Sequence, residues 1–310
     1  MANFHLKLKF KTEMSFSDFM EDCISDLKSR QKYVTAMNYQ KTLNSFTLFL
    51  GKHNPKISKI NQDIVEDYSR WLTGRQVSKN SISFYMRNLR SVYNKAAKNE
   101  KKVDGNPFRN VYTGVDKTKK RAVNEDVVMR LQSLDLHKSP ALALSRDLFI
   151  FSYCTRGMAF IDIAFLKKDS IRDEVILYRR HKTGQELSVK IEPCTRKIIE
   201  RYRDATASTP YVFPIITTTD SEKAWSQYQT ALAYHNRKLK RLGKLAGEDL
   251  PISSYTARHT WATAARNHNI PISVISAGMG HTSEKTTRIY LASIDNSVID
   301  TANQSLLKGL

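Results

Sequence analysis

Four basic side chains and one tyrosine lie in sequence settings that do not need them for folding. Arg156 lies in CTRGMAFIDIAFL, at the start of an expected apolar helix, and Arg258 lies among small and apolar residues in TARHTWATAA. Lys182 lies in RRHKTGQ, and the stretch GHTSEKTTRIYL places His281 nine residues before Tyr290. Taken singly, each is explained by a salt bridge, a solvated turn, a helix cap or a packed ring. Taken together they form a set that could act on a phosphate.

The chemistry that these residue types suit is transfer of a phosphodiester. Arginine forks bind non-bridging oxygens bidentately and neutralise the charge that develops on them. Arginine is preferable to lysine there because its planar fork fits the phosphate and it stays charged. A tyrosine hydroxyl can form a covalent phosphoester and later leave it, and a lysine can protonate a departing oxygen as a general acid.

Elements that would position these groups can be read from hydrophobic spacing. Apolar residues at helical spacing predict four helices in the first hundred residues, capped by Ser15, Asn61 and Ser78, with the second starting after Thr35. The fourth helix carries a second, polar stripe that suits phosphates and base edges, although a merely solvated face has the same composition. The stripe consists of Lys79, Ser83, Arg87, Arg90 and Asn94.

A loop, GNPFRNVYTGVDKTKKR, follows the four helices and indicates a linker between two domains. We place the boundary near Asp116, with an extension over 1–12, a helical DNA-binding domain over 13–115, a basic linker over 116–122 and a second domain over 123–310. A charged strap would let two DNA-binding bodies close around a duplex. Its candidate DNA-contacting residues are Lys117, Lys119, Lys120 and Arg121.

The second part of the chain has mixed patterns. EVILYRR and ELSVKIEP predict two strands with HKTGQ as the turn between them, which places Lys182 at a hairpin tip. Helices are predicted on both sides of this hairpin, so the fold class of this part is α-rich α+β. Gly280 is expected to end one helix and Ser283 or Thr282 to cap the next. A last amphipathic segment carries Val298, Ala302 and Leu306.

Charge indicates the class of partner. Fifty Lys and Arg against thirty Asp and Glu give a net charge of +20 in 310 residues. A chain this basic favours a polyanion, most often nucleic acid, over a basic surface without a binding role. The basic residues are spread over many elements and no apolar run approaches about 20 residues, so a membrane is not expected as a partner.

Composition also bears on location and on metals. The N-terminal stretch MANFHLKLKFKTEM lacks the apolar block of a secretory signal, so we expect a cytoplasmic protein. Cys23, Cys154 and Cys194 are far apart and form no CxxC pair, and the histidines lack the i,i+4 spacing of a helical metal pair. We therefore expect neither a metal site nor a cofactor.

The order Arg, Lys, Tyr-x-x-Arg-His, Gly-His and then Tyr resembles the tyrosine recombinase (phage integrase) family. The resemblance covers most of the chain and is most specific in TARHTWAT and GMGHTSEKTTRIYL. It implies an all-α N-terminal core-binding (SAM-like) domain followed by an α-rich α+β catalytic domain. It also implies catalytic roles for Arg156, Lys182, Arg258, His281 and Tyr290.

Two positions depart from the family pattern. Tyr255 stands where the family usually has His, three residues before the second Arg, and Ala159 stands where it commonly has Glu. A tyrosine with an ordinary pKa near 10 is a poor general base, so Tyr255 is expected at most to hydrogen bond the phosphate. Asp162 is a hypothetical replacement for the missing Glu, and His259 is a second supporting candidate.

The resemblance implies a site-specific recombinase that cleaves and rejoins DNA strands through a 3′-phosphotyrosine, without metal or ATP. Its expected partners are double-stranded DNA and three further copies in a synaptic homotetramer, with a monomer free in solution. The outcome, whether integration, excision, inversion or resolution, is left open. Two alternatives are relaxation of DNA by a type IB topoisomerase and a non-catalytic sequence-specific DNA-binding protein. The presence of all five catalytic types argues against the second.

Overall fold

The computed structural model describes residues 14–97, 106–116, 122–249 and 251–291, and residues 303, 304 and 307 near the C-terminus. Within these ranges the chain divides into two compact units, Met1–Thr118 and Lys119–Leu310. Each unit has its own hydrophobic core, the first formed by residues between Phe16 and Val111 and the second by residues between Val127 and Ala257.

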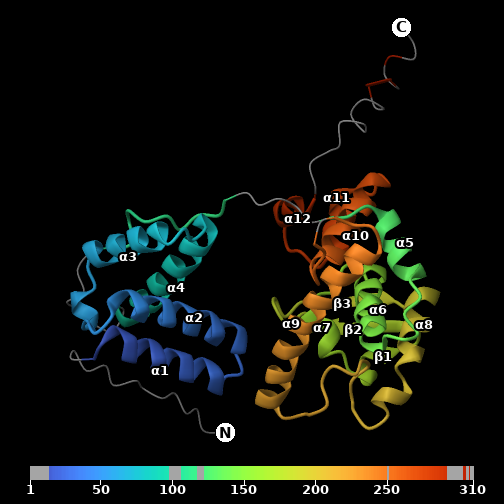
Figure 1. Ribbon diagram of the computed structural model, residues 1–310, viewed down its shortest axis with the longest axis horizontal. Helices are drawn as coiled ribbons and strands as arrows, with labels where there is room; N and C mark the ends of the chain where they lie inside the picture. Colours follow the sequence, from blue (N-terminus) through green and yellow to red (C-terminus); the bar gives the residue numbers. More distant parts are fainter. Residues whose placement is uncertain are drawn as a thin grey trace. The chain divides into compact units, whose positions relative to one another are not determined.

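The named secondary-structure elements in the described part of the first unit are all helices (Figure 1). All three predicted caps are confirmed, because the side chains of Ser15, Asn61 and Ser78 accept hydrogen bonds from backbone N–H groups in the first turns of α1, α3 and α4. α2 begins at Tyr33, slightly before the predicted start, and has no side-chain cap. The helices are α1 (Phe16–Ser29), α2 (Tyr33–Leu50), α3 (Gln62–Gly74) and α4 (Lys79–Ala97).

Aromatic side chains hold the four helices of the first unit together. Phe46 of α2 lies edge-on to Phe16 of α1 and to Tyr68 of α3, with ring centroids 5.8 and 5.1 Å apart. The buried Tyr68 hydroxyl donates to Ser45 Oγ, so its polar group is satisfied. α4 contacts each of the other three helices and thereby closes the bundle.

A three-stranded antiparallel sheet lies in the second unit, in the order β1-β2-β3. Its strands are β1 (Ile171–Arg172), β2 (Val175–Arg179) and β3 (Glu186–Lys190). The predicted hairpin is confirmed: β2 pairs with β3 through Arg179 opposite Glu186, and Lys182 lies in the connecting turn. The two-residue strand β1 is too short to have given a sequence pattern.

Helices make up the rest of the second unit around one face of this sheet, and the other face, with Leu177, is exposed (Figure 1). α6 is central, with contacts to α5, α7, α8, α9 and α10, and its fully buried Phe151 packs edge-on against Phe213 at 4.8 Å. The helices are α5 (Glu125–Ser133), α6 (Pro140–Cys154), α7 (Phe160–Ala164), α8 (Pro193–Arg201), α9 (Ser221–Leu245), α10 (Thr256–Asn267), α11 (Ile272–Gly278) and α12 (Glu284–Tyr290).

The apolar stretch around Arg156 is not one helix. We expected Arg156 at the start of an apolar helix, but α6 ends at Cys154 and the five-residue α7 starts at Phe160. Arg156 lies in the turn between them with φ of 60°, followed by Gly157 with φ of 75°. Apolar composition misled the sequence interpretation because both flanking helices are buried against the same core.

Several predicted positions lie outside the described residues. These are the linker residues Lys117, Lys119, Lys120 and Arg121 and the C-terminal residues Val298, Ala302 and Leu306.

Candidate active site

Arg258 on α10 is enclosed, with 2% of its surface exposed. Its Nη1 donates to the carbonyl oxygen of Gly157 at 2.7 Å, and its Nη2 donates to the carbonyl oxygen of Met279 at 2.6 Å. A Cβ at position 157 would lie 2.7 Å from Arg258 Cγ, so glycine is required for the turn to approach the arginine this closely. The guanidinium is thus fixed between the turn after α6 and the end of α11.

The end of α11 presents His281. Gly280 has φ of 64°, and the N–H groups of Gly280 and His281 donate to the carbonyls of Ala277 and Ser276, at 2.9 Å each. This pair of bonds is the Schellman arrangement that terminates a helix. The predicted role of Gly280 as the end of a helix is confirmed.

The hydrogen bonds of the His281 ring assign its tautomer. Nε2 lies 3.0 Å from Arg258 Nη2, and Nδ1 lies 2.9 Å from Thr287 Oγ1 on α12. An arginine has only donors, so Nε2 must be the acceptor and Nδ1 carries the hydrogen that points to Thr287. Donation from Nε2 to a phosphate oxygen therefore requires either a second proton on the ring or the other neutral tautomer, in which the Thr287 hydroxyl donates to Nδ1.

The surroundings of His281 oppose that second proton. Burial, together with the positive charges of Arg258, Arg180 and Lys182, lowers the pKa of His281 to about 4. The ring is neutral at pH 7 in the absence of a negatively charged ligand. Burial is the largest cause of this low pKa, and the three positive charges act in the same direction.

Arg156 reaches the same region from the turn after α6. Its Nη1 lies 3.3 Å from the carbonyl oxygen of Ser188 on β3, and its Cδ passes close to Gly278 at the end of α11. In the described part of the chain, no carboxylate lies within 4.0 Å of Arg156 to form a salt bridge. Its charge is not cancelled locally and is therefore available to an anion.

Arg180 was missed by the sequence interpretation, although it lies two residues before Lys182. It is 5% exposed, and its Nη1 donates to the carbonyl oxygen of Gly280 at 2.6 Å. The signal was the period-two pattern of β2, which places Ile176, Tyr178 and Arg180 on the inward face. Charged residues are rarely buried without a partner, so a charged residue on the inward face of a strand indicates a specific contact.

Positive charges converge around Tyr178. Burial and the neighbouring Asp162 raise the pKa of the Tyr178 hydroxyl to about 12, while Arg258, Arg180 and Arg156 act in the opposite direction. Three arginines from three separate segments therefore act on one buried hydroxyl. Such a cluster is costly without a counter-charge, which a bound phosphate would supply.

The supporting candidates have different surroundings. Asp162 on α7 is 4% exposed, and it accepts a hydrogen bond from the backbone N–H of His181 at 2.8 Å. Tyr255 occupies the N-cap position of α10, is 39% exposed, and its ring lies edge-on to His259 at 5.5 Å. The structure therefore brings Asp162 to the hairpin that carries Lys182 and leaves Tyr255 at the surface, one helical turn before Arg258.

Tyr290 is the last residue of α12, and its side chain lies outside the described part of the structure. α12 contacts both α10 and α11, the helices that carry Arg258 and lead to His281. Ser283 occupies the predicted N-cap position, but its side chain makes no capping hydrogen bond. The backbone of α12 thus follows directly after the His281 segment, and position 290 lies about one helical turn after Thr287.

Only part of the polar stripe of α4 is exposed to solvent. Lys79 and Arg87 are exposed, and the partly buried Arg90 donates to Thr113 Oγ1 at 3.3 Å. Ser83 is fully buried and its hydroxyl donates to the carbonyl oxygen of Gly114. The prediction that Ser83 contacts DNA is therefore wrong, because the 106–116 segment covers that part of the helix.

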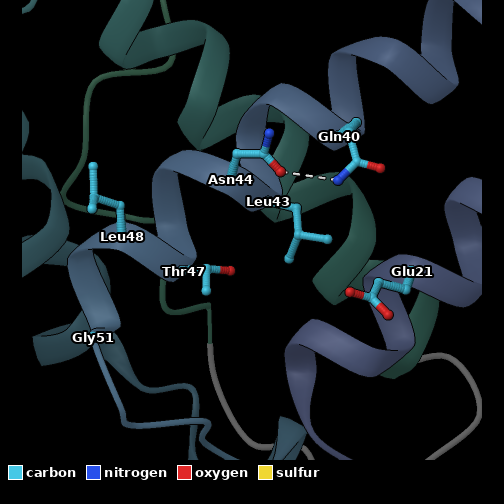
Figure 2. A pocket seen from close by; sticks show the side chains of 7 residues that line it. All are labelled: Glu21, Gln40, Leu43, Asn44, Thr47, Leu48 and Gly51. Carbon is cyan, nitrogen blue, oxygen red and sulfur yellow. Dashed lines mark hydrogen bonds between the residues drawn. The ribbon is translucent and has the colours of Figure 1, made fainter.

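A hollow on the first unit lies between α1 and α2 (Figure 2). Its lining contains one carboxylate, Glu21, and the side-chain amide of Gln40 donates to Asn44, one turn further along α2, at 2.9 Å. No lysine or arginine lines it, so it does not suit a polyanion. The lining residues are Glu21, Gln40, Leu43, Asn44, Thr47, Leu48 and Gly51.

Within the described ranges, no three His, Cys, Asp or Glu side chains lie together as a metal site requires. No helix in the same ranges is both long and apolar enough to cross a membrane.

Comparison with known protein families identifies the family of the chain that carries these residues. Residues 124–297, more than half of the chain, match the family model described as Phage integrase family. The chain belongs to the phage integrase family of tyrosine recombinases. Residues 15–115 match the model described as Phage integrase SAM-like domain.

Integrase relatives cover most of the chain. It is 25% identical to the tyrosine recombinase XerD of Pseudomonas putida over 83% of this chain and 85% of the relative. It is 22% identical to a tyrosine recombinase of Pseudothermotoga lettingae over 89% and 93% of the two chains.

Solved integrase structures have the same fold. A lambda integrase dimer bound to a COC′ core site superimposes with a TM-score of 0.67 at 14% identity, covering 89% of this chain and 95% of that one. The Tn1549 transposon integrase, in complex with transposon right end DNA, gives 0.63 at 13% identity, covering 94% and 99%. The predicted fold class, a helical SAM-like domain followed by an α-rich α+β catalytic domain, is confirmed.

Proposed function

We infer that the protein is a site-specific recombinase that cleaves and rejoins DNA strands. The observation that carries this inference is the convergence of Arg156, Arg180, Arg258 and His281, from segments far apart in sequence, in a member of the tyrosine recombinase family. Arginine forks held by backbone carbonyls are preorganised to bind the non-bridging oxygens of a phosphodiester.

Tyr290 is the nucleophile in this proposal. Its phenol oxygen attacks the phosphorus while the bond to the 5′ oxygen breaks, and the phenol proton passes to solvent. The departing 5′ oxygen takes a proton from the ammonium group of Lys182, which acts as general acid. The products are a 3′-phosphotyrosine and a free 5′ hydroxyl. Attack by a 5′ hydroxyl of a partner duplex reverses these steps and releases Tyr290.

We further propose that neither a metal ion nor ATP takes part. Arginine charges supply the electrostatic stabilisation that a metal supplies in other phosphoryl-transfer enzymes. The phosphotyrosine retains the energy of the original phosphodiester, so rejoining needs no external source. Cleavage in the presence of a chelator and without nucleotide tests this, and a requirement for either would contradict it.

The proposed partner is double-stranded DNA, with residues 13–115, the linker over 116–122 and the catalytic domain over 123–310 enclosing the duplex. The net charge of +20 and the exposed Lys79 and Arg87 support this. Strand exchange between two duplexes needs four sites, and lambda integrase has been solved as a tetramer bound to a Holliday junction. We propose a tetramer on DNA and a monomer in free solution.

A nicked duplex that traps the covalent intermediate tests the proposal. Wild-type protein should give a denaturation-resistant protein–DNA adduct on its own site, and Tyr290→Phe should give none. Products that join two differently labelled duplexes would distinguish recombination from DNA relaxation. If the wild type forms no adduct, the inference fails.

A further inference from the structure

Within the part of the chain that the structure describes, the Lys182 side chain makes no hydrogen bond or ion pair, yet the two residues before it each contact a different element. It is exposed at the tip of the β2–β3 hairpin. A general acid must lie within hydrogen-bond reach of the oxygen it protonates. An exposed lysine on a free turn would sample many positions, so something else must restrict the turn.

Arg180 supplies one restriction. Its backbone closes the turn, because its N–H donates to the Gln185 carbonyl at 2.9 Å and its carbonyl accepts from the Gly184 N–H at 2.8 Å. Its buried side chain donates to the carbonyl oxygen of Gly280, the residue before His281. The base of the Lys182 turn is therefore fixed to the segment that presents His281.

Close packing tightens this contact. A Cβ at position 280 would lie 2.8 Å from Leu187 Cδ1 and 3.2 Å from Arg180 Cδ. Glycine at this position thus serves two purposes, because it adopts the positive φ that ends α11 and lets both strands of the hairpin approach.

Asp162 supplies the other restriction, one residue further along the turn. Its Oδ1 accepts the backbone N–H of His181 at 2.8 Å and lies 3.1 Å from His181 Nδ1. The carboxylate is 3% exposed, so the hydrogen bond from the His181 backbone N–H forms away from competing water. The His181 ring, 40% exposed, rests against Phe165 with ring centroids 4.9 Å apart.

We propose that Asp162 and Arg180 are positioning residues for Lys182, fixing the two residues before it to α7 and to the Gly280 carbonyl. The proposal rests on the inferred role of Lys182 as general acid. It also accounts for Ala159, because the carboxylate that this chain lacks there is supplied by Asp162 one turn further on.

The leaving group distinguishes this role from a merely structural one. Replacing the bridging 5′ oxygen of the scissile phosphate by sulfur removes the need for a general acid, because a thiol ionises far more readily than an alcohol. A variant that acts through Lys182 should therefore be slow on the oxygen substrate and normal on the sulfur substrate. A variant that distorts the arginine cluster should be slow on both.

The rate of covalent adduct formation on matched oxygen and sulfur duplexes is the measurement. Asp162→Ala and Arg180→Met should each slow cleavage of the oxygen substrate by about 10- to 100-fold, part of the effect of a general acid. Asp162→Ala should cleave the sulfur substrate within about 3-fold of wild type, as Lys182→Ala should. Arg180→Met also removes one charge of the arginine cluster, so it should slow both substrates, but the oxygen substrate about 10-fold more than the sulfur substrate. DNA affinity should be unchanged in Asp162→Ala, because this variant loses no positive charge and no exposed side chain.

Matched variants serve as controls. Arg179→Ala removes an exposed arginine of the same hairpin, paired with Glu186 on the outward face, and should behave as wild type. His181→Ala keeps the hydrogen bond from its backbone N–H to Asp162, so its cleavage rate should stay within about 3-fold of wild type. Asp162→Asn keeps an acceptor oxygen, so its cleavage rate should also fall little, and it guards against misfolding of Asp162→Ala.

Equal slowing on both substrates, or oxygen cleavage at the wild-type rate in Asp162→Ala and Arg180→Met, would overturn the proposal. Failure of the underlying function has a different signature. In that case the wild type gives no Tyr290-dependent adduct on either substrate.

Discussion

At the scale of single residues, arginines supply the fixed positive charge of the site, and His281 is the group that can gain a proton. Arg258 and Arg180 are held by backbone carbonyls, and such contacts leave their positive charge intact. His281 stays neutral beside them because burial and these charges lower its pKa to about 4. A bound phosphate reverses this balance, since a negative charge favours the protonated ring.

Proton uptake at His281 on DNA binding is the first expected outcome. The pKa in the free protein is about 4, and a neighbouring phosphate raises it, so at a pH between the two values binding takes up a proton. Affinity for cleavage-site DNA should rise as pH falls from 7 towards 5. Calorimetric titrations of Tyr290→Phe protein in buffers of different ionisation enthalpy measure the uptake.

The matched control for this uptake is the double variant with His281→Gln. It retains hydrogen-bonding capacity but cannot titrate. Equal uptake with and without His281 would contradict the assignment. In the free protein the sign for stability is opposite: the unfolded ring binds a proton below about 6.5, so stability contributed by neutral His281 is lost as pH falls from there towards 4.

Arg156 combines a proposed catalytic role with an unfavourable backbone conformation. Its φ of 60° costs a non-glycine residue about 1 kcal/mol or more. Arg156→Gly should therefore raise the free energy of unfolding of the second unit by about 1 kcal/mol while abolishing adduct formation. Urea unfolding and the nicked-duplex assay measure the two effects.

Gln31, after α1 in the first unit, gives a matched comparison because its φ is 56°. Gln31→Gly should show the same gain in stability with cleavage retained. A loss of stability in Arg156→Gly would show that contacts of the side chain outweigh the backbone cost.

At the scale of elements, two helices bring a pair of thiols together. Cys154 at the end of α6 and Cys194 at the start of α8 have their sulfurs 2.8 Å apart. An added diazene oxidant such as diamide should convert this pair to a disulfide, taking up two electrons and two protons. Burial and the neighbouring Cys194 raise the pKa of the Cys154 thiol above its usual range, so oxidation should be slow at pH 7 and faster at pH 9.

Peptide mapping by mass spectrometry detects the link. Cys23, buried in the other unit, should stay reduced, and Cys194→Ser should prevent the intramolecular product. Only intermolecular disulfides would show that α6 and α8 do not approach as described.

Sequence patterns were sufficient where an element depends on its own residues. The caps of α1 and α3, the turn that carries Lys182 and the end of α11 at Gly280 follow from local hydrogen bonding and from glycine's freedom at positive φ. They failed where distant segments meet. The bond from Arg180 to Gly280 joins residues a hundred positions apart, and no local pattern specifies such a contact.

Two further errors have the same origin. Ser83 fits a solvent-facing stripe by spacing, but the segment that covers it comes 31 residues later. Arg156 looked helical because its neighbours are apolar, whereas positive φ at a non-glycine residue leaves no trace in composition. Tertiary packing determines the burial of Ser83 and the backbone conformation of Arg156.

At the scale of the whole molecule, charge governs the encounter with DNA. Binding should weaken steeply with salt, because neutralised phosphates release counterions. Arg87→Gln on the exposed face of α4 should lower the slope of log affinity against log salt by about 1. Lys41→Gln, an exposed change on α2 away from that stripe, is the control and should leave the slope nearly unaltered. Filter binding at several salt concentrations measures both, and a flat response in the wild type would contradict phosphate-dominated binding.

Two separate cores predict two unfolding events. Phe46→Ala in the first core and Phe151→Ala in the second should each cost about 3–5 kcal/mol, but in different calorimetric transitions. A scan of the full chain should show one transition lowered and the other unchanged in each variant. A single transition that shifts in both variants would mean that the units unfold as one.

The separation of the two cores also has a consequence for descent. Because the two cores share no residue within the described ranges, a substitution inside the first core leaves the core residues of the second unit unchanged. Lineages can therefore exchange or diversify the first unit while inheriting the second unchanged. Gene fusion at the segment between the units would be a productive route to new target preference, and phylogenies of the two halves are expected to disagree.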